Sequence, residues 1–278
     1  MVPSSLVNTM KQAIQNDEVR RKVQERYAGV AQNHEGGCGC VPGCCSGVLE
    51  SGTDAVKLGY TGEDVASVPE GSEMGLGCGN PTALASIKHG ETIIDLGSGG
   101  GFDAFLCSKQ TGLSGNVIGV DMTPDMISKA RKNAASGGYS NVEFRLGEIE
   151  NLPIADNTAD LIISNCVINL SPDKSRVFAE AFRVLKPGGR IAISDIVALQ
   201  PIPESMGEDF AAYTGCISGA ASAPEVQAML AASGFDEIRV DIKEGSRQFI
   251  NDWLPGHRAG DYVASANITA KKPPFSRQ

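Results

Sequence analysis

Short apolar runs alternate along the chain with segments whose apolar residues recur every three or four positions. A short apolar run bounded by turn residues is typical of a buried strand, and the wider spacing is typical of a helix with one buried face. We therefore predict strands at residues 92–96, 116–120, 142–146, 159–164, 190–196, 237–243 and 262–270. The helices predicted between them are residues 102–109, 124–136, 174–185 and 224–233. This alternation predicts a doubly wound, mostly parallel seven-stranded α/β sheet with helices on both faces.

The segments on either side of this alternating region have different patterns. Residues 8–30 are polar but carry a loose apolar face, which predicts a helix; that face consists of Met10, Ile14, Val19, Val23 and Tyr27. Residues 199–222 form an insertion that we expect to cover the carboxyl edge of the sheet as a lid or substrate wall. We divide the chain into an N-terminal helix with cysteine-rich loops (1–80), a nucleotide-binding domain (81–197), and a region that adds the insertion and completes the sheet (198–278).

Composition and charge narrow the class of ligand. The 278 residues are 41% hydrophobic and 21% charged, which is ordinary for a globular protein. The net charge of −9 argues against nucleic acid or an anionic membrane as a partner, because both need a basic surface, and leaves small molecules. The apolar runs are strand-sized and residues 1–20 lack the apolar region of a signal peptide, so we expect a cytoplasmic protein with mainly reduced cysteines.

A glycine cluster follows the first predicted strand and opens the next helix. The dinucleotide pattern Gly-x-Gly-x-x-Gly fails here, because Phe102 stands where its third glycine would be. The cluster instead matches acidic-x-Gly-x-Gly-x-Gly, which resembles motif I of methyltransferases that use S-adenosylmethionine (SAM); the matching residues are Asp95, Gly97, Gly99 and Gly101, with Ser98 between them. The alternative is a glycine-rich turn that merely connects two elements.

Further candidate contacts for a nucleotide lie at the ends of the next strands. Asp121 closes the second strand, where a carboxylate accepts hydrogen bonds from ribose hydroxyls, although it could also cap the following helix; Met122 is next to it. The resemblance to SAM-dependent methyltransferases implies that Glu148 lies near the adenine amino group and Ile149 against the adenine ring. It also implies that Asn165, at the end of the fourth strand, lies next to the methyl donor.

The eight cysteines occur in distinct settings. Four lie at positions 38, 40, 44 and 45, in a glycine-rich loop whose spacing differs from the Cys-x-x-Cys pairs of zinc modules. Cys78 is surrounded by glycines, and Cys166 leaves the fourth strand, where a cysteine is often only a small buried hydrophobe. Cys107 lies within a predicted helix and is most simply a core residue.

Together these motifs resemble the arsenite SAM methyltransferases from about residue 40 to the C-terminus. The segments that carry the resemblance are Cys44-Cys45, residues 75–81 around Cys78, residues 95–101, residues 147–153, residues 165–170 around Cys166, and residues 215–220 around Cys216. The resemblance implies a class I, Rossmann-like SAM-dependent methyltransferase that binds no metal cofactor tightly and acts as a monomer. Its substrates would be arsenite and methylated arsenicals.

The resemblance also implies roles for the cysteines. Cys166 and Cys216 would hold trivalent arsenic, with Cys78 nearby, since soft thiolates are its preferred ligands. An N-terminal cysteine, Cys45 in preference to Cys44, would form a disulfide with Cys78 when arsenic is reduced, and a thioredoxin- or glutathione-type system would reopen it. Two alternatives stay open: a methyltransferase of a quinone- or sterol-like carbon acceptor, and a non-catalytic metalloid-binding protein.

Overall fold

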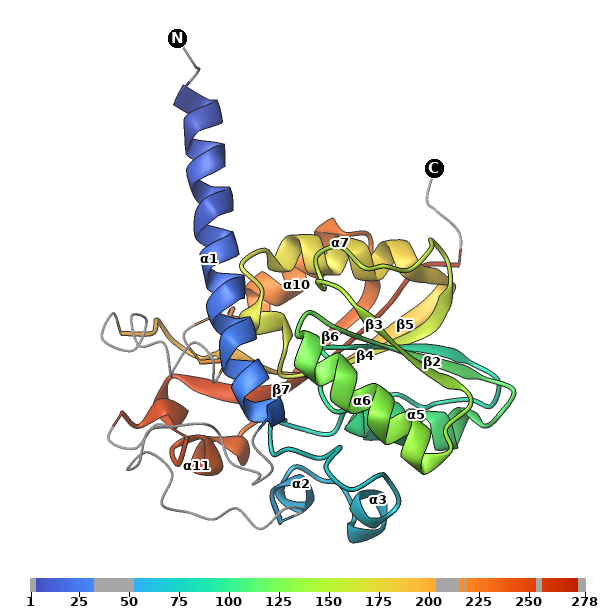
Figure 1. The fold of residues 1–278 in the computed structure, drawn as a ribbon. Helices are drawn as coiled ribbons and strands as arrows, with labels where there is room; N and C mark the ends of the chain where they lie inside the picture. Colours follow the sequence, from blue (N-terminus) through green and yellow to red (C-terminus); the bar gives the residue numbers. More distant parts are fainter. Residues whose placement is uncertain (1–3, 33–52, 204–215, 218, 254–256, 275–278) are drawn as a thin grey trace.

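The protein is described here from a computed structural model. The described residues are 4–32, 53–203, 216–217, 219–253 and 257–274, and every structural statement below concerns these residues (Figure 1). Of the predicted features, the cysteines at positions 38–45 and most of the insertion at 199–222 lie outside them.

A seven-stranded sheet forms the centre of the molecule. Its strands are β1 Thr92–Leu96, β2 Asn116–Asp121, β3 Val142–Leu146, β4 Ala159–Asn165, β5 Leu185–Ala198, β6 Asp236–Lys243 and β7 Val263–Lys271. They lie in the order β3-β2-β1-β4-β5-β7-β6, and β7 runs antiparallel to both of its neighbours, whereas the other pairs are parallel. The predicted mostly parallel seven-stranded fold is therefore confirmed.

Helices cover both faces of this sheet (Figure 1). They are α5 Phe102–Thr111 and α6 Pro124–Gly137 on one face, and α7 Lys174–Val184 and α10 Ala223–Ala232 on the other. Side chains of β1 alternate between the two layers: Ile93 packs with Phe105 of α5, and Ile94 belongs to the core that contains Phe178 of α7. This alternation follows from the two-residue period of a strand, and it buries β1 between the helix layers from Ile93 onward.

Short helices carry the chain around the sheet. They are α2 Thr53–Lys57, α3 Gly62–Ala66 and α4 Pro81–Leu84 before β1, α11 Ser246–Ile250 before β7, and two 3-10 turns, η1 Ile168–Leu170 and η2 Ala259–Asp261. The turn η1 immediately follows β4, so it lies at the carboxyl edge of the sheet, where ligands bind in such folds.

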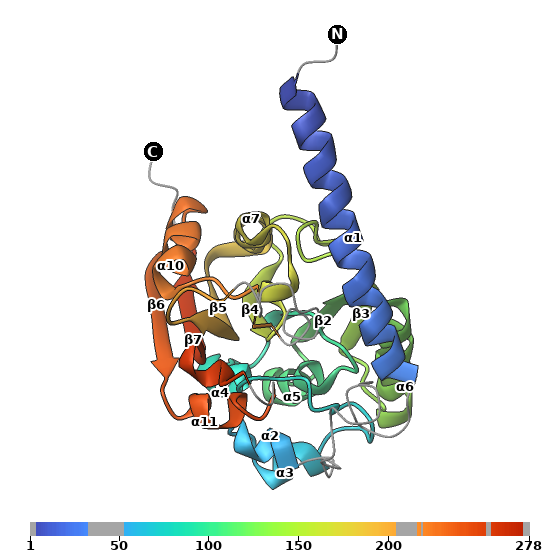
Figure 2. The ribbon, with the colours of Figure 1, turned by 90° about the vertical axis from the view of Figure 1, so that its left-hand side faces the viewer.

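The N-terminal helix α1 spans Ser4–Gln32, which confirms the helix predicted there and extends it at both ends. Its first half projects away from the body, and its second half packs beside α6 (Figures 1 and 2). Val23 is fully buried, whereas Ile14 is 66% exposed, so the predicted apolar face is packed at Val23 and not at Ile14. The packed part of α1 is therefore its second half.

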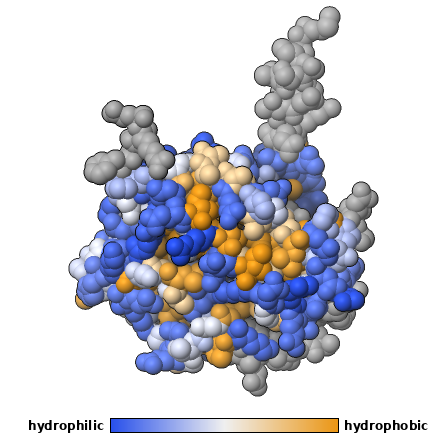
Figure 3. All heavy atoms as spheres, turned by 180° about the vertical axis from the view of Figure 1, so that it is seen from behind, coloured by the Kyte–Doolittle hydropathy of each residue, from blue (hydrophilic) through white to orange (hydrophobic). Residues whose placement is uncertain are grey.

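One face of the molecule shows how polar and hydrophobic side chains are distributed on the surface. Seen from behind, hydrophobic side chains gather near the middle of a face that is otherwise hydrophilic (Figure 3). Within the described ranges, no helix combines the length and hydropathy needed to cross a bilayer.

Candidate active site

A cleft opens at the carboxyl edge of the sheet, where the predicted ligand residues meet. Its lining includes these predicted residues: Asp95, Gly97, Ser98, Gly99, Asp121, Met122, Ile149, Asn165 and Cys166. Each follows or ends a parallel strand, which is why residues far apart in the chain converge here. Gly101 and Glu148 are not among the lining residues of this cleft.

The glycine turn after β1 gives the cleft its floor. Gly97 and Gly99 have positive φ values of 69° and 50°, a conformation that costs glycine little. The Gly99 N–H donates to the Asp121 carboxylate over 3.0 Å, so β2 holds the turn in place. Ser98 Oγ is buried, and no hydrogen-bond partner for it exists among the described residues. The turn thus presents backbone that a ligand can approach closely.

Gly101, the last glycine of the predicted motif, lies at the start of α5. It has a φ of 97° and precedes the first residue of α5, and a Cβ there would come within 2.8 Å of Phe144. Gly101 therefore lets the chain turn into α5 against the aromatic core and does not face the cleft.

Three buried carboxylates make the cleft suited to a cation. Burial raises the pKa of Asp95 well above its ordinary value, and the neighbouring charges of Asp103 and Asp121 raise it further. Burial also raises the pKa of Asp121, and that of Asp103 to about 6. A positively charged ligand would relieve this unfavourable burial of negative charge.

Asn165 connects the cleft to the cysteine loop before β1. Its side-chain oxygen accepts the Cys78 N–H over 3.0 Å, and its amide group donates to the Gly79 carbonyl over 2.9 Å. The amide also lies 3.2 Å from the Asp103 carboxylate, which accepts the Tyr60 hydroxyl over 2.6 Å. Sequence analysis did not identify Tyr60 or Asp103, although Asp103 lies in the first turn after the glycine motif, where an acidic residue could have been noted.

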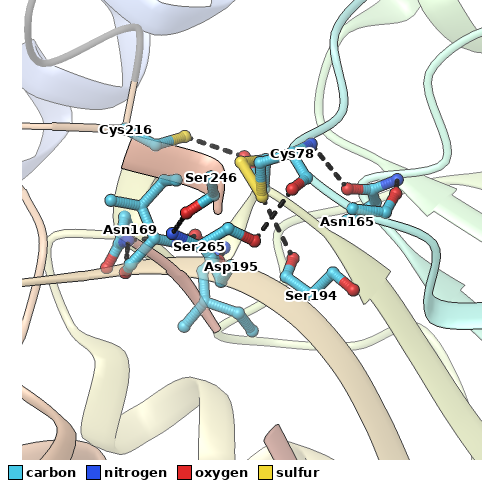
Figure 4. The surroundings of a disulfide bond; sticks show 12 residues. Cys78, Asn165, Asn169, Ser194, Asp195, Cys216, Ser246 and Ser265 are labelled. Atoms are coloured by element: carbon cyan, nitrogen blue, oxygen red, sulfur yellow. Dashed lines mark hydrogen bonds between the residues drawn. A yellow bond between two sulfur atoms is a disulfide. The ribbon is translucent and has the colours of Figure 1, made fainter. Parts of the chain in front are cut away.

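Three cysteines meet at the inner end of the cleft (Figure 4). Cys78 and Cys166 are joined by a disulfide with 5.8 Å between their Cα atoms, and the Cys216 thiol donates to the Cys166 carbonyl over 2.8 Å. Cys166 lines the cleft, and all three cysteines belong to one buried cluster with Ile196 and Ile217. The predicted arsenic ligands are therefore brought together at the boundary of the cleft.

The disulfide pairing differs from the one predicted for the redox step. The prediction joins Cys78 to Cys45 or Cys44, both of which lie outside the described residues, so it stays a prediction. A sulfur atom holds one such bond at a time, so the predicted pair could form only after the bond between Cys78 and Cys166 has opened. Cys107 is a free, buried residue packed beside Phe105, as predicted for a core position.

Asp195 of β5 lies beside the cysteines and was also missed. One carboxylate oxygen and the sulfurs of Cys78 and Cys166 all lie within 4.8 Å of one another. The carboxylate accepts the N–H groups of Ile168 and Ile196 over 2.9 and 2.7 Å, so it ties η1, just after Cys166, to β5. Burial raises the pKa of Asp195 to about 6 and keeps the buried Cys216 thiol protonated by raising its pKa well above 9.

Glu148 lies outside the cleft, beside α1. Its side chain is half-exposed and pairs with Arg20 over 3.4 Å, and it lines an adjoining hollow with Met122 and Leu146. Ile149, in contrast, is buried in the core and lines the cleft itself. Of the two predicted adenine contacts, the structure brings only Ile149 to the cleft.

The chain is similar to known methyltransferases in sequence and in structure. Residues 87–234 match a family described as a methyltransferase domain. An arsenite methyltransferase of Halobacterium salinarum is 50% identical over 264 residues, covering 92% of this chain and 67% of the relative. The human arsenite methyltransferase is 38% identical over 170 residues, covering 57% of this chain and 44% of the relative.

A solved structure extends the comparison. The crystal structure of an arsenic(III) S-adenosylmethionine methyltransferase from Chlamydomonas reinhardtii superimposes with a TM-score of 0.58 at 34% identity, covering 73% of this chain and 69% of that one. The chain thus spans about two thirds of the archaeal relative and of the algal structure, and less than half of the human relative.

Proposed function

The chain belongs to the arsenite methyltransferase family, and on that basis we propose that it transfers the methyl group of SAM to trivalent arsenic. The observation that carries this proposal is the position of Cys166, which lines the cleft and at the same time lies in the cluster with Cys78 and Cys216. A methyl-donor site and a set of soft thiol ligands therefore share a boundary, as a transfer from one to the other requires.

The residues of the cleft fit SAM. Asp121 would accept the ribose hydroxyls, Ile149 would pack against adenine, and Asp95, with Asp103 behind Asn165, would compensate the positive charge of the ligand. The glycine turn leaves room for close contact between the ligand and the backbone. When bound, SAM supplies an electrophilic methyl group.

The cysteines would hold and orient arsenic. Once the disulfide is reduced, Cys78, Cys166 and Cys216 offer three sulfurs, and each arsenic–sulfur bond that forms with arsenous acid releases one water. Arsenic keeps its lone pair in this state, so position and orientation supply much of the rate and no strong base is needed. Asp195 and Asn165 would fix the backbone on either side of the thiols.

Each methyl transfer uses the arsenic lone pair and leaves arsenic pentavalent. Return to the trivalent state takes two electrons, which two thiols supply when they become a disulfide. We propose that Cys78 is one of these thiols and that Cys45 or Cys44 is the other. A thioredoxin- or glutathione-type reductant would then reopen the bond, which places the monomeric enzyme in a reducing compartment such as the cytoplasm.

A turnover assay tests the proposed function. With labelled SAM, arsenite and excess dithiol, we expect methylated arsenicals; without thiol, we expect activity to fall by about tenfold or more, because the disulfide occupies two arsenic ligands. Chromatography of the arsenic species measures both results. Methyl transfer to a quinone-like acceptor in place of arsenite, with or without thiol, would instead support a carbon-acceptor enzyme.

Binding of the methyl donor should depend on pH. The pKa of Asp103 is raised to about 6, so this group gains a proton as the pH falls through 6. The pKa values of Asp95 and Asp121 are also raised, so their titration acts in the same direction. A cationic ligand favours their ionised forms, so SAM should bind about tenfold more tightly at pH 7 than at pH 5. Calorimetry at both pH values, in buffers of different ionisation enthalpy, measures the affinity and the protons released. Equal affinities would show that these carboxylates do not sense the ligand.

A further inference from the structure

The second half of α1 forms one wall of the cleft. Arg20, Val23 and Tyr27 of this helix are among the lining residues, although the rest of the cleft is built by residues that lie after position 54. Their spacing of three and four places them on one face of the helix. Val23 is 1% exposed, so the middle of this face is packed against the body.

Arg20 attaches this wall to the loop after β3. Its guanidinium donates to Glu150 over 3.2 and 3.3 Å and lies 3.4 Å from Glu148. The Glu150 side chain is only 8% exposed and also accepts the Ser171 hydroxyl. This loop carries Ile149, the residue proposed to contact adenine. Arg20 therefore connects α1 to both sides of that residue.

The contacts continue along the same helix face. Gln24 donates to the carbonyl of Met122, the residue after Asp121, which is proposed to bind ribose. Tyr27 lines the cleft and packs against the cysteine cluster that contains Cys166 and Cys216. One helix face thus spans the proposed adenine side, the proposed ribose side and the thiol end of the cleft.

We propose that the second half of α1 covers one side of the bound methyl donor and slows its release. Arg20 is the positioning residue that keeps α1 in this place, through its ion pairs with Glu148 and Glu150. The inference rests on the proposed function only in taking SAM and its product S-adenosylhomocysteine as the ligands. Breaking a part-buried charge pair acts mainly on the dissociation rate. Loss of Arg20 should therefore speed ligand release without altering the thiols.

Arg20→Ala, compared with Arg21→Ala, tests this proposal in the full chain. Arg21 is a matched control, because it is the next residue of the same helix and, among the described residues, its ion pair is with exposed Glu25. We expect S-adenosylhomocysteine to dissociate about tenfold faster from Arg20→Ala and at the wild-type rate from Arg21→Ala, as measured by stopped-flow displacement. Equal rates in the two variants would overturn the proposal.

Two further measurements separate this result from misfolding and from failure of the proposed function. Arg20→Lys keeps the charge but not the forked contact, so it should fall between wild type and Arg20→Ala. Arsenite binding by the reduced protein should be the same in all three, whereas a merely unfolded variant would lose it. Ligand release is measured without arsenic. Faster dissociation of S-adenosylhomocysteine from Arg20→Ala would therefore support the proposed role of α1 even if arsenite proves not to be the substrate.

Discussion

Replacing Cys166 with serine is expected to lower arsenite methylation by at least about 100-fold while S-adenosylhomocysteine still binds. Serine is close to cysteine in size, but its hydroxyl is a hard, protonated oxygen that arsenic binds poorly. Cys166 is also the one cysteine that lines the cleft, so no other described thiol can take its place at the point of transfer. A misplaced reacting atom alone costs on the order of 100-fold in rate.

Cys107→Ala is the matched control for this variant. Cys107 is buried in α5 beside Phe105, away from the cysteine cluster, so its loss should affect stability but not turnover. Steady-state methylation and calorimetry of S-adenosylhomocysteine on both variants would separate the two roles. Full activity in Cys166→Ser would remove Cys166 from the arsenic site and favour a carbon acceptor.

The sheet and the glycine turn could be predicted because their signals are local. The run that becomes β1 and the glycines after it lie within eleven residues, and a parallel sheet necessarily places such turns at one edge. The cysteines could be assigned only through the family resemblance, because no local pattern shows that Cys78, Cys166 and Cys216 meet.

The remaining site residues act through contacts between distant parts of the chain. Tyr60 reaches Asp103 across 43 positions, and Arg20 reaches Glu150 across 130. In the sequence, Asp195 is a polar residue within a mostly apolar strand. Its role becomes visible only in the fold, where η1 lies beside β5 and the Ile168 N–H donates to the Asp195 carboxylate. The same cause explains why Ile14 is exposed although it lies on the predicted apolar face: helical spacing shows which residues share a face, but not how much of the helix packs against the body.

Gly97→Ala is expected to weaken binding of the methyl donor and to disturb the arsenic-binding cysteines at the same time. The alanine would have to adopt a φ of 69°, which costs about 1–2 kcal/mol. Its Cβ would also lie 2.7 Å from the Val167 Cβ, and such overpacking costs a further 1–3 kcal/mol or so. Relief requires Val167 to move, and Val167 directly follows Cys166. We therefore expect the variant to lose roughly 2–5 kcal/mol of unfolding free energy, to bind S-adenosylhomocysteine at least about tenfold more weakly and to methylate little arsenite.

Gly138→Ala separates backbone strain from this steric effect. Gly138 has nearly the same φ, 70°, but no atom lies within 4 Å of the position its Cβ would take. It should therefore lose only the strain energy, about 1–2 kcal/mol, and keep ligand affinity and turnover. Urea unfolding and calorimetry on both variants measure the difference. Equal ligand affinity in Gly97→Ala and Gly138→Ala would mean that Val167 can move without disturbing Cys166. In that case the close packing of Gly97 against Val167 would not link the methyl-donor site to the arsenic site.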